Sequence, residues 1–502
     1  MSVTHTPYPH VPDWAKKVAE MLGNGPHVVV SGISVSGNIH VGNFREVLVA
    51  EAVASALRAR GEEVRFIFHA DTIDPLRKIA PGIPESYKEY LGHSLSRVPD
   101  PAGGHASYAE HFLAPFEKTL RDLDMDIEVL RSHEVYEAGV YTEVTREALE
   151  RTGELREILQ ETSGREMPES WSPYLPRAAS GDLTGNLVVE HRPQESEVVF
   201  VDREGNEEVA DYSRGEGKLG WRVELAARWK ALGVTFEPFG KDHTSRGGST
   251  DTADRMAREV FDYPVPGRYE YEWIQLKGQG AMSSSKGIVL LPQDLLKIMP
   301  PDALRSLVLG RDPARALDLD LTEGFPRFIE EYLAAAGVGT VPFNHLVTVA
   351  QTSTDPAIAA GMLRRGGYEA AAEAPDLEEK LRHARNWAEE WAPESLRLRI
   401  LEPEEAEEAA GKLDEGQREY LRTVAGKLDP ALGGDEVQDL LYSTAVESGV
   451  KPRKAFAAIY AVLLGAKHGP KAGPFIAGLP TELVQERFSP CDTEHPVHDG
   501  RG

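Results

Sequence analysis

A strand, a glycine-containing turn, a helix and a second strand follow one another between residues 27 and 68, and this order constrains the fold more than any other feature. Residues 27–30 are a β-prone run, and residues 64–68 are another. Between them, residues 44–60 carry apolar side chains every four positions, and Gly61 is a typical helix stop. Strands joined through a helix run parallel. We therefore predict an α/β fold built on a parallel sheet.

Similar patterns of strands and helices return later in the chain. The spacing predicts helices at 221–232 and 251–261, and strands at 234–236, 273–276 and 288–291. A hairpin is expected around residues 204–206, and almost all of the chain beyond residue 325 has helical spacing. We therefore expect four parts: the two halves of a sheet domain at 1–80 and 216–325, an insertion at 81–215 that is first helical and then rich in turns and strands, and an all-helical C-terminal domain at 326–502.

The composition excludes several classes of protein. The chain has 502 residues, 41% of them hydrophobic, and its 55 Lys and Arg against 81 Asp and Glu give a formal charge of −26. These values are typical of a globular protein and argue against one that wraps nucleic acid without specificity. No apolar run approaches the roughly 20 residues that a membrane helix needs. Residues 1–14 lack the pattern of a signal peptide, so we expect a cytoplasmic protein with no membrane partner.

The turn after the first strand has the composition of an anion-binding site. Residues 31–37 are mostly Ser and Gly, Gly42 opens the following helix, and His40 and Asn43 are the polar side chains beside it. Small residues let a ligand approach the backbone, and a helix N-terminus offers N–H groups to an anion. The glycine spacing differs from the dinucleotide fingerprint and disfavours an NAD-type site. The alternative is an ordinary turn with a structural histidine.

A second segment, 278–287, places three hydroxyls and one cation in a loop between two apolar runs. These side chains are Ser283, Ser284, Ser285 and Lys286. Such a loop can close over a polyphosphate and offset the charge that develops during phosphoryl or nucleotidyl transfer. The alternative is a solvated hairpin tip.

Together the two segments resemble the signature pair of class I aminoacyl-tRNA synthetases. His40-Val41-Gly42-Asn43 is similar to the HIGH element, and residues 281–285 stand where the KMSKS element belongs. Five longer runs narrow the resemblance to the class I lysyl-tRNA synthetases: SGISVSGNIHVGNFREV (31–47), HADTIDPLRK (69–78), FGKDH (239–243), YEWIQLKG (271–278) and GVKPRKAFAAIYAVLLGAKHGPKAGPF (449–475). The resemblance covers most of the chain and is weakest at 80–215 and 330–445.

The resemblance implies a Rossmann-like catalytic domain and a two-step reaction. L-lysine would attack the α-phosphorus of ATP to give lysyl-adenylate and pyrophosphate, and the 3′-terminal adenosine of tRNA(Lys) would then take the lysyl group. Neither step needs a covalent enzyme intermediate, so positioning and charge stabilisation would carry the catalysis. Mg²⁺ would accompany ATP, with water and phosphate as most of its ligands.

The resemblance also implies roles for individual residues, with His40, Asn43 and Lys286 as the catalytic ones. The implied ATP-binding residues are His40, Gly42, Asn43, Asp242, His243, Met282, Ser283, Ser284, Ser285 and Lys286. The implied lysine-binding residues are Gly32, Ser34, Trp221 and Tyr271, whose two rings would enclose the aliphatic stem and attract the ammonium. Core packing is the alternative for both rings, and helix capping is the alternative for Asp242. Asp71, Asp74 and Glu272 stay open as partners of the ammonium.

A local basic stretch lies near the end of this acidic chain. The resemblance implies that Lys451, Arg453, Lys454 and Lys471 bind tRNA, in a C-terminal domain that would also contact the anticodon. The alternative is a solvated helix face.

The chain departs from the family pattern in two ways. Ala281 and Ser284 stand where KMSKS has its two lysines, so Lys286 is the cation left in the loop. Members of the family often carry cysteine-rich zinc knuckles in the insertion, whereas Cys491 is the only cysteine here. We therefore expect no structural zinc and no other metal site of the protein's own.

Two other functions stay open. One is the same chemistry with another amino acid, such as glutamate, or for a product other than ribosomal protein. The other is a tRNA-binding regulatory protein that has lost amino-acid activation. Ala281 favours this second alternative, whereas His40, Gly42, Asn43 and Lys286 oppose it.

We expect Lys286→Ala chiefly to slow adenylate formation, because it removes the cation that would offset charge on the phosphates. Lysine-dependent ATP–pyrophosphate exchange measures this step. An unchanged exchange rate would remove the assignment of 278–287 as a closing loop.

Overall fold

The computed structural model describes residues 11–164, 166–278, 280–281, 289–335 and 341–489. It divides the chain into two compact units, each described by itself. Unit 1 comprises Met1–Leu296 and Pro301–Leu319, and unit 2 comprises Lys297–Pro300 and Asp320–Gly502. In the ranges given above, no helix is both long and apolar enough to cross a membrane.

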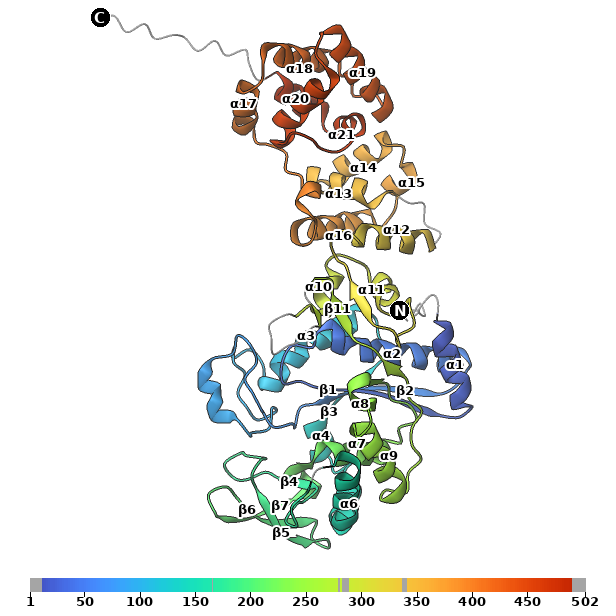
Figure 1. Cartoon of the computed structure of the whole chain (residues 1–502), viewed down its shortest axis with the longest axis vertical. Coiled ribbons are helices and arrows are strands. Elements are labelled where there is room, and N and C mark those ends of the chain that lie inside the picture. Colours follow the sequence, from blue (N-terminus) through green and yellow to red (C-terminus); the bar gives the residue numbers. More distant parts are fainter. Residues whose placement is uncertain (1–10, 165, 279, 282–288, 336–340, 490–502) are drawn as a thin grey trace, which may run out of the picture. The chain divides into compact units, whose positions relative to one another are not determined.

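A parallel sheet forms the centre of unit 1 (Figure 1). The strands β1 (His27–Ser34), β2 (Val64–Asp71) and β3 (Glu128–Arg131) pair in that order, and both pairings are parallel. On the other side of β1, Phe236 forms parallel bridges to Val29 and Gly267. Beyond these bridges β9 (Phe239–Gly240) pairs with β10 (Glu270–Tyr271), again in parallel. The strands β2 and β3 therefore lie on one side of β1 and the later strands on the other, which opens a crevice at the carboxyl ends of the strands.

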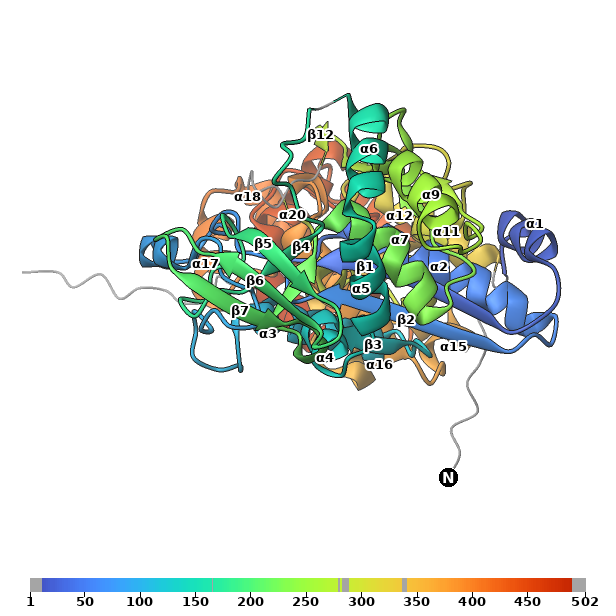
Figure 2. The same cartoon turned by 90° about the horizontal axis from the view of Figure 1, so that it is seen from below.

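Helices cover both faces of this sheet (Figures 1 and 2). The helix α2 (Val41–Ala59) lies on one face, and α7 (Trp221–Leu232) and α9 (Ser249–Glu259) lie on the other. Val30 and Ile67 of the sheet share one buried core with Leu225 of α7 and Met256 of α9. The first helix, α1 (Asp13–Leu22), packs on α2. The α/β fold with a parallel sheet is confirmed.

The stretch from residue 81 to residue 219 adds helices and small antiparallel sheets to unit 1. Its elements are the 3₁₀ turn η1 (Glu85–Tyr90), α3 (Tyr108–Asp122), α4 (Ser132–Glu137), α5 (Thr142–Glu150), α6 (Thr152–Ser163), β4 (Tyr174–Pro176), β5 (Leu187–Arg192), β6 (Glu197–Val201), β7 (Glu207–Asp211), the 3₁₀ turn η2 (Tyr212–Arg214) and β8 (Gly217–Leu219). The strands β5, β6 and β7 form one antiparallel sheet, and β4 pairs with β8. The predicted hairpin joins β6 to β7, with Gly205 at a φ of 92°.

The turn-rich segment before β5 is held by backbone and amide hydrogen bonds. The Asn186 side-chain amide donates to the carbonyls of Pro176 and Asp182 at 2.7 and 2.9 Å. Part of the range that we predicted as an insertion also belongs to the central sheet, because α3 leads into β3 beside β2.

Two predicted strands form differently in the structure. Only Phe236 bridges within 234–236, and the strand proper begins at Phe239, because Pro238 has no N–H to donate to a ladder. Residues 289–291 form no strand, and Ile288 lies outside the described residues. The Leu290 carbonyl instead accepts the N–H of Val41, the first residue of α2, at 2.9 Å.

The remaining elements of unit 1 follow α7. They are α8 (Lys241–Thr244), β11 (Ile274–Leu276), β12 (Gly280–Ala281), α10 (Pro292–Leu296), α11 (Pro301–Leu309) and β13 (Leu317–Leu319). The strand β11 pairs antiparallel with β12 and parallel with β13.

All the regular elements among the described residues of unit 2 are helices, as predicted. Its elements are α12 (Phe325–Ala335), α13 (Phe343–Thr352), α14 (Pro356–Arg365), α15 (Glu369–Ala372), α16 (Leu377–Glu390), the 3₁₀ turn η4 (Glu394–Leu396), α17 (Pro403–Gly411), α18 (Glu415–Lys427), α19 (Gly434–Glu447), α20 (Pro452–Leu464), α21 (Ala472–Gly478) and α22 (Thr481–Phe488). Trp387 is fully buried against Phe325 and Phe343, and its ring N–H donates to the Leu321 carbonyl at 2.7 Å.

A buried guanidinium ties α2 to the segments around β11. Arg45 is 1% exposed and donates to the backbone carbonyls of Glu272, Trp273 and Arg315. Desolvation lowers the pKa of Arg45 to about 10, which still leaves it charged at neutral pH. Arg45 therefore fixes the position of the strand that leads toward residues 282–288.

We expect Arg45→Met to lower the free energy of unfolding by about 3 kcal/mol, because it leaves buried carbonyls without a donor. Urea denaturation measures the change. The control is Arg65→Met, whose ion pair with Glu128 lies at the surface and should contribute less than about 1 kcal/mol. If both substitutions had equally small effects, the three hydrogen bonds of Arg45 would not be what fixes the segments around β11.

Candidate active site

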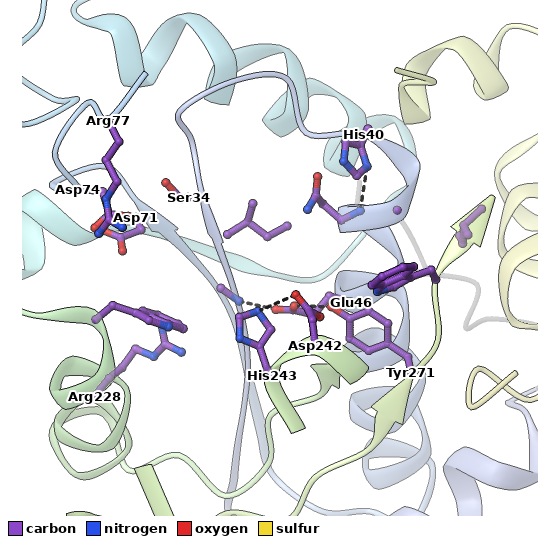
Figure 3. A pocket seen from close by; sticks show the side chains of 17 residues that line it. Ser34, His40, Glu46, Asp71, Asp74, Arg77, Arg228, Asp242, His243 and Tyr271 are labelled. Atoms are coloured by element: carbon purple, nitrogen blue, oxygen red, sulfur yellow. Dashed lines mark hydrogen bonds and ion pairs between the residues drawn. The ribbon is translucent and has the colours of Figure 1, made fainter. Parts of the chain in front are cut away.

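A pocket of about 600 Å³ lies at the carboxyl ends of the parallel strands, beside the point where the strand order reverses (Figure 3). Open α/β sheets bind their ligands at this place. Nine of the predicted site residues line it: Gly32, Ser34, His40, Gly42, Asn43, Trp221, Asp242, His243 and Tyr271. Five others, Met282, Ser283, Ser284, Ser285 and Lys286, lie outside the described residues. The structure thus brings together residues that the chain separates by more than 200 positions.

His40 caps α2 with its own side chain. Its Nδ1 accepts the N–H of Asn43 at 3.3 Å, so a neutral ring carries its proton on Nε2. Desolvation lowers the pKa of His40, which keeps the ring neutral at pH 7. A Cβ atom on Gly42 would lie 2.9 Å from this ring, so the glycine makes room for the imidazole. The arrangement leaves the Nε2–H as a donor for an anion in the pocket.

The described flanks of residues 282–288 lie beside this histidine. Before the segment, β12 pairs with β11, and Ile274 of β11 lines the pocket. After the segment, the Leu290 carbonyl accepts the N–H of Val41, which directly follows His40. The described residues on either side of 282–288 are therefore bonded to β11 and to the start of α2, two elements that contribute side chains to the pocket.

Glu46, which our sequence analysis missed, also lines the pocket. Its two carboxyl oxygens accept the Gly32 N–H at 2.9 Å and the Tyr271 hydroxyl at 2.7 Å. Burial raises the pKa of Glu46 to about 8. A signal was available, since Glu46 stands three positions after Asn43 on α2 and therefore on the same face of the helix.

Arg228 is a second missed residue, and it restricts what Trp221 can do. Its guanidinium carbon lies 5.6 Å from the centre of the Trp221 ring. Arg228 is 1% exposed and forms a buried ion pair with Glu237. A Cβ atom on Gly32 would lie 2.9 Å from Arg228 Nη1, so the glycine leaves space for the guanidinium. A cation of the protein itself thus lies against Trp221, which is half-buried at the pocket wall.

Lys218 organises three carboxylates at one end of the pocket. Its Nζ lies 2.6 Å from Asp74, 3.2 Å from Asp71 and 2.7 Å from Glu224. Burial opposes the charged amine, but the attraction of the three carboxylates outweighs it and raises the pKa of Lys218. Desolvation raises the pKa of Glu224 to about 7. Asp71 and Asp74 therefore already have a cation of the protein as their partner.

The structure also shows the local contacts of Asp242 and His243, the two predicted nucleotide-binding residues that follow β9. Asp242 lies within α8, whose N-cap is Gly240, so it does not cap that helix. His243 lies with its Nδ1 3.4 Å from the Ser249 hydroxyl. Glu272, one of the three carboxylates left open, pairs with Lys241 near the surface and is not among the residues that line the pocket.

The predicted tRNA-binding cations lie around α20 and α21 in unit 2. Lys454 pairs with Asp414 at 3.2 Å, and Lys471 pairs with Asp435 at 3.0 Å. Lys451 precedes α20 as its N-cap residue, and Arg453 lies in its first turn. Acidic neighbours thus offset part of the local positive charge, and the tRNA-binding role stays a prediction.

The chain matches the family described as tRNA synthetases class I (K) over residues 12–340. It is 39% identical over 495 residues to a lysine–tRNA ligase of Archaeoglobus fulgidus, with 95% of this chain and 99% of that protein covered. The chain belongs to the class I (K) tRNA synthetases. This membership confirms the resemblance that began with residues 40–43.

Two further lysine–tRNA ligases align along nearly the whole chain. A lysine–tRNA ligase of Methanosarcina barkeri strain Fusaro is 36% identical, with 96% of this chain and 98% of that protein covered. One from Thermoplasma acidophilum is 32% identical, with 96% and 99% covered. Among solved structures, a glutamate–tRNA ligase of Elizabethkingia meningosepticum aligns with a TM-score of 0.42 at 13% identity, over 92% of this chain and 98% of that one.

We expect Lys218→Met to lower the free energy of unfolding by about 3–5 kcal/mol at pH 8, because buried carboxylates lose their cation. The loss should shrink toward pH 5, since Glu224, whose pKa desolvation raises to about 7, becomes protonated there and needs no partner. Urea denaturation at both pH values measures this. Lys230→Met, which breaks a partly exposed pair with Glu147, should cost less than about 1 kcal/mol at either pH. A loss that is equal at both pH values would contradict the electrostatic account.

Proposed function

We propose that this protein is a lysine–tRNA ligase of translation. It activates L-lysine with ATP to lysyl-adenylate and transfers the lysyl group to the 3′-terminal adenosine of tRNA(Lys). The observation that carries the proposal is that His40 and the predicted lysine-binding residues line one pocket, while the described flanks of residues 282–288 bond to elements beside it. The relatives named lysine–tRNA ligase, which align along nearly the whole chain, support it.

In the first step the lysine carboxylate attacks the α-phosphorus of ATP. The Nε2–H of His40 and the amide of Asn43 donate to phosphate oxygens, where negative charge builds up in the transition state. The N-terminus of α2 adds its oriented N–H groups. Lys286, with Met282 and Ser283–Ser285, closes over the departing pyrophosphate. The neutral state of His40 suits a donor that must not lose its proton to the substrate.

Lysine lies against the end of β1, at Gly32 and Ser34, with Trp221 and Tyr271 beside it. Asp242 and His243, which line the same pocket, contact the nucleotide. ATP enters as its Mg²⁺ complex, with phosphate and water oxygens as the main ligands of the ion. Among the described residues no cluster of His, Cys, Asp and Glu is arranged to hold a metal, and the absence of structural zinc stays a prediction.

In the second step the tRNA places its 3′-terminal adenosine at the adenylate, and unit 2 contacts the rest of the tRNA and the anticodon. Lys451, Arg453, Lys454 and Lys471 contribute to that surface. Binding to phosphate by local cations on a protein with a net charge of −26 should weaken steeply with added salt. The protein acts in the cytoplasm.

ATP–pyrophosphate exchange with each of the twenty amino acids, with and without tRNA, tests the proposal. Lysine alone should support exchange and should then be transferred to tRNA(Lys). Exchange with another amino acid would indicate a synthetase of different specificity. No exchange with any amino acid, with tRNA binding retained, would indicate the regulatory protein that Ala281 favours.

We expect His40→Ala to slow lysine-dependent exchange by about 10²–10³-fold while KM for lysine stays nearly unchanged, because the lost donor acts on the phosphates. His40→Asn is the matched control, since Asn can cap α2 without restoring the Nε2–H. Steady-state exchange kinetics and thermal unfolding separate the two roles. Recovery of activity in His40→Asn would make His40 a capping residue only.

A further inference from the structure

A single buried hydroxyl lies between two side chains of the pocket wall. Ser249, the first residue of α9, is 8% exposed and is not among the residues that line the pocket. Its Oγ lies 3.4 Å from Trp221 Nε1 and 3.4 Å from His243 Nδ1. The centres of these two rings are 6.3 Å apart. One oxygen atom behind the pocket therefore contacts two rings that line it.

The hydrogen-bonding capacity of the three groups decides where their protons lie. An indole N–H can only donate, so the Ser249 oxygen accepts from Trp221. Among the described residues, the one acceptor within hydrogen-bond distance of the Ser249 hydroxyl is His243 Nδ1. The hydroxyl therefore donates to Nδ1, because the opposite direction would leave its own buried proton without an acceptor. A neutral ring that accepts at Nδ1 has its proton on Nε2.

The turn before Ser249 is fixed to both neighbouring segments. Arg222, next to Trp221 on α7, donates from Nη1 to the Gly248 carbonyl at 3.1 Å. A Cβ atom on Gly248 would overlap the carbonyl oxygen of His243, so the turn packs directly on the backbone of that residue. The hydroxyl contacts are long for hydrogen bonds, as is common before a substrate fills a site. The fixed turn nevertheless keeps Ser249 between the two rings.

We propose that Ser249 is a positioning residue for amino-acid activation, which holds His243 in the Nε2–H form and so gives the pocket a fixed donor for an oxygen of the nucleotide. This inference rests on the proposed function. Asp242 Oδ2 lies 3.8 Å from His243 Nε2, too far to accept that proton (Figure 3). Because Ser249 also accepts from Trp221, one hydroxyl orients the predicted lysine-binding ring and the predicted nucleotide-binding ring together.

The position of the ring proton can be measured directly. In protein labelled with nitrogen-15 histidine, the chemical shifts of the two ring nitrogens distinguish the Nε2–H form from the Nδ1–H form at pH 8. Comparison with His243→Gln identifies the signals of His243. We expect the Nε2–H form in the wild type and a mixture of both forms in Ser249→Ala. A wild-type ring with its proton on Nδ1 would overturn the proposal, whatever reaction the protein catalyses.

Kinetics test whether this orientation serves the reaction. We expect Ser249→Ala to lower kcat/KM for ATP in lysine-dependent ATP–pyrophosphate exchange about 10-fold, because the donor is no longer held toward the nucleotide. Ser249→Thr keeps the hydroxyl and should recover most of the rate. Ser245→Ala is the matched control, since that hydroxyl lies in the same turn and donates to the Asp242 carbonyl, and its kinetics should be unchanged. Thermal unfolding verifies that each variant is folded.

A double-mutant cycle separates a role through His243 from a merely structural one. In a His243→Gln background, Ser249→Ala should have a much smaller effect on kcat/KM for ATP than in the wild type. Fully additive effects, or unchanged kinetics in folded Ser249→Ala, would overturn the positioning role. Equal losses in Ser249→Ala and Ser249→Thr, with the Nε2–H form kept in both, would also overturn it, because packing and not the hydroxyl would then matter.

Failure of this inference and failure of the proposed function give different results. No lysine-dependent exchange in the wild type would overturn the proposed function and with it the role of Ser249 in activation. Normal exchange in the wild type, together with any of the contradicting results for Ser249, would overturn the inference alone.

Discussion

Helix α2 holds the pocket together, because Arg45 and Glu46, two adjacent residues near its start, bond to segments on opposite sides of the pocket. Arg45 binds the backbone around β11, and Glu46 binds Gly32 of β1 and Tyr271 of β10. The His40 cap lies at the N-terminus of the same helix. A ligand group placed at that N-terminus is therefore fixed relative to both halves of the sheet, which is the geometric condition for in-line attack on a phosphate.

Most charged side chains around the pocket form ion pairs with one another and are shielded from solvent. Lys218 faces three carboxylates, and Arg228 faces Glu237. Buried pairs of this kind recover little more than the desolvation of their own charges, so they add little to overall stability. Their value lies in orientation, because each group is held at one place and gives the pocket a defined potential. Glu46 stands apart from this pattern, because the groups that bond to its carboxyl are two neutral donors, the Gly32 N–H and the Tyr271 hydroxyl.

Some elements followed directly from local sequence, and others did not. The βαβ unit, the hairpin at 204–206 and the helices of unit 2 were predictable, because periodicity and turn residues act over a few positions. The strand predicted at 234–236 does not form because Pro238 interrupts the ladder. The strand predicted at 288–291 is absent over its described residues 289–291, where the Leu290 carbonyl bonds to α2 instead. The short β3, within the expected insertion, is recognisable as part of the sheet only through its pairing with β2.

Some residues of the candidate site were likewise predictable from local sequence, and others were not. The His40–Asn43 motif is visible in the sequence, because its capping bond and its glycine act within four residues. Glu46, Lys218 and Arg228 were missed, since what matters about them is a contact with residues far away in the chain. Both signature segments and the family follow from local residue order alone.

The sequence by itself determined the βαβ start, the helical C-terminal part, the family and the net charge. Only the tertiary structure decided which carboxylates of the pocket pair with a cation, that Trp221 rather than Tyr271 has a guanidinium against its ring, and that the carboxyl of Glu46 has a pKa raised to about 8. The physical reason is that ionisation depends on burial and on distances through space. The spacing of residues 46 and 271, or of 71 and 218, does not specify those quantities until the sheet brings them together.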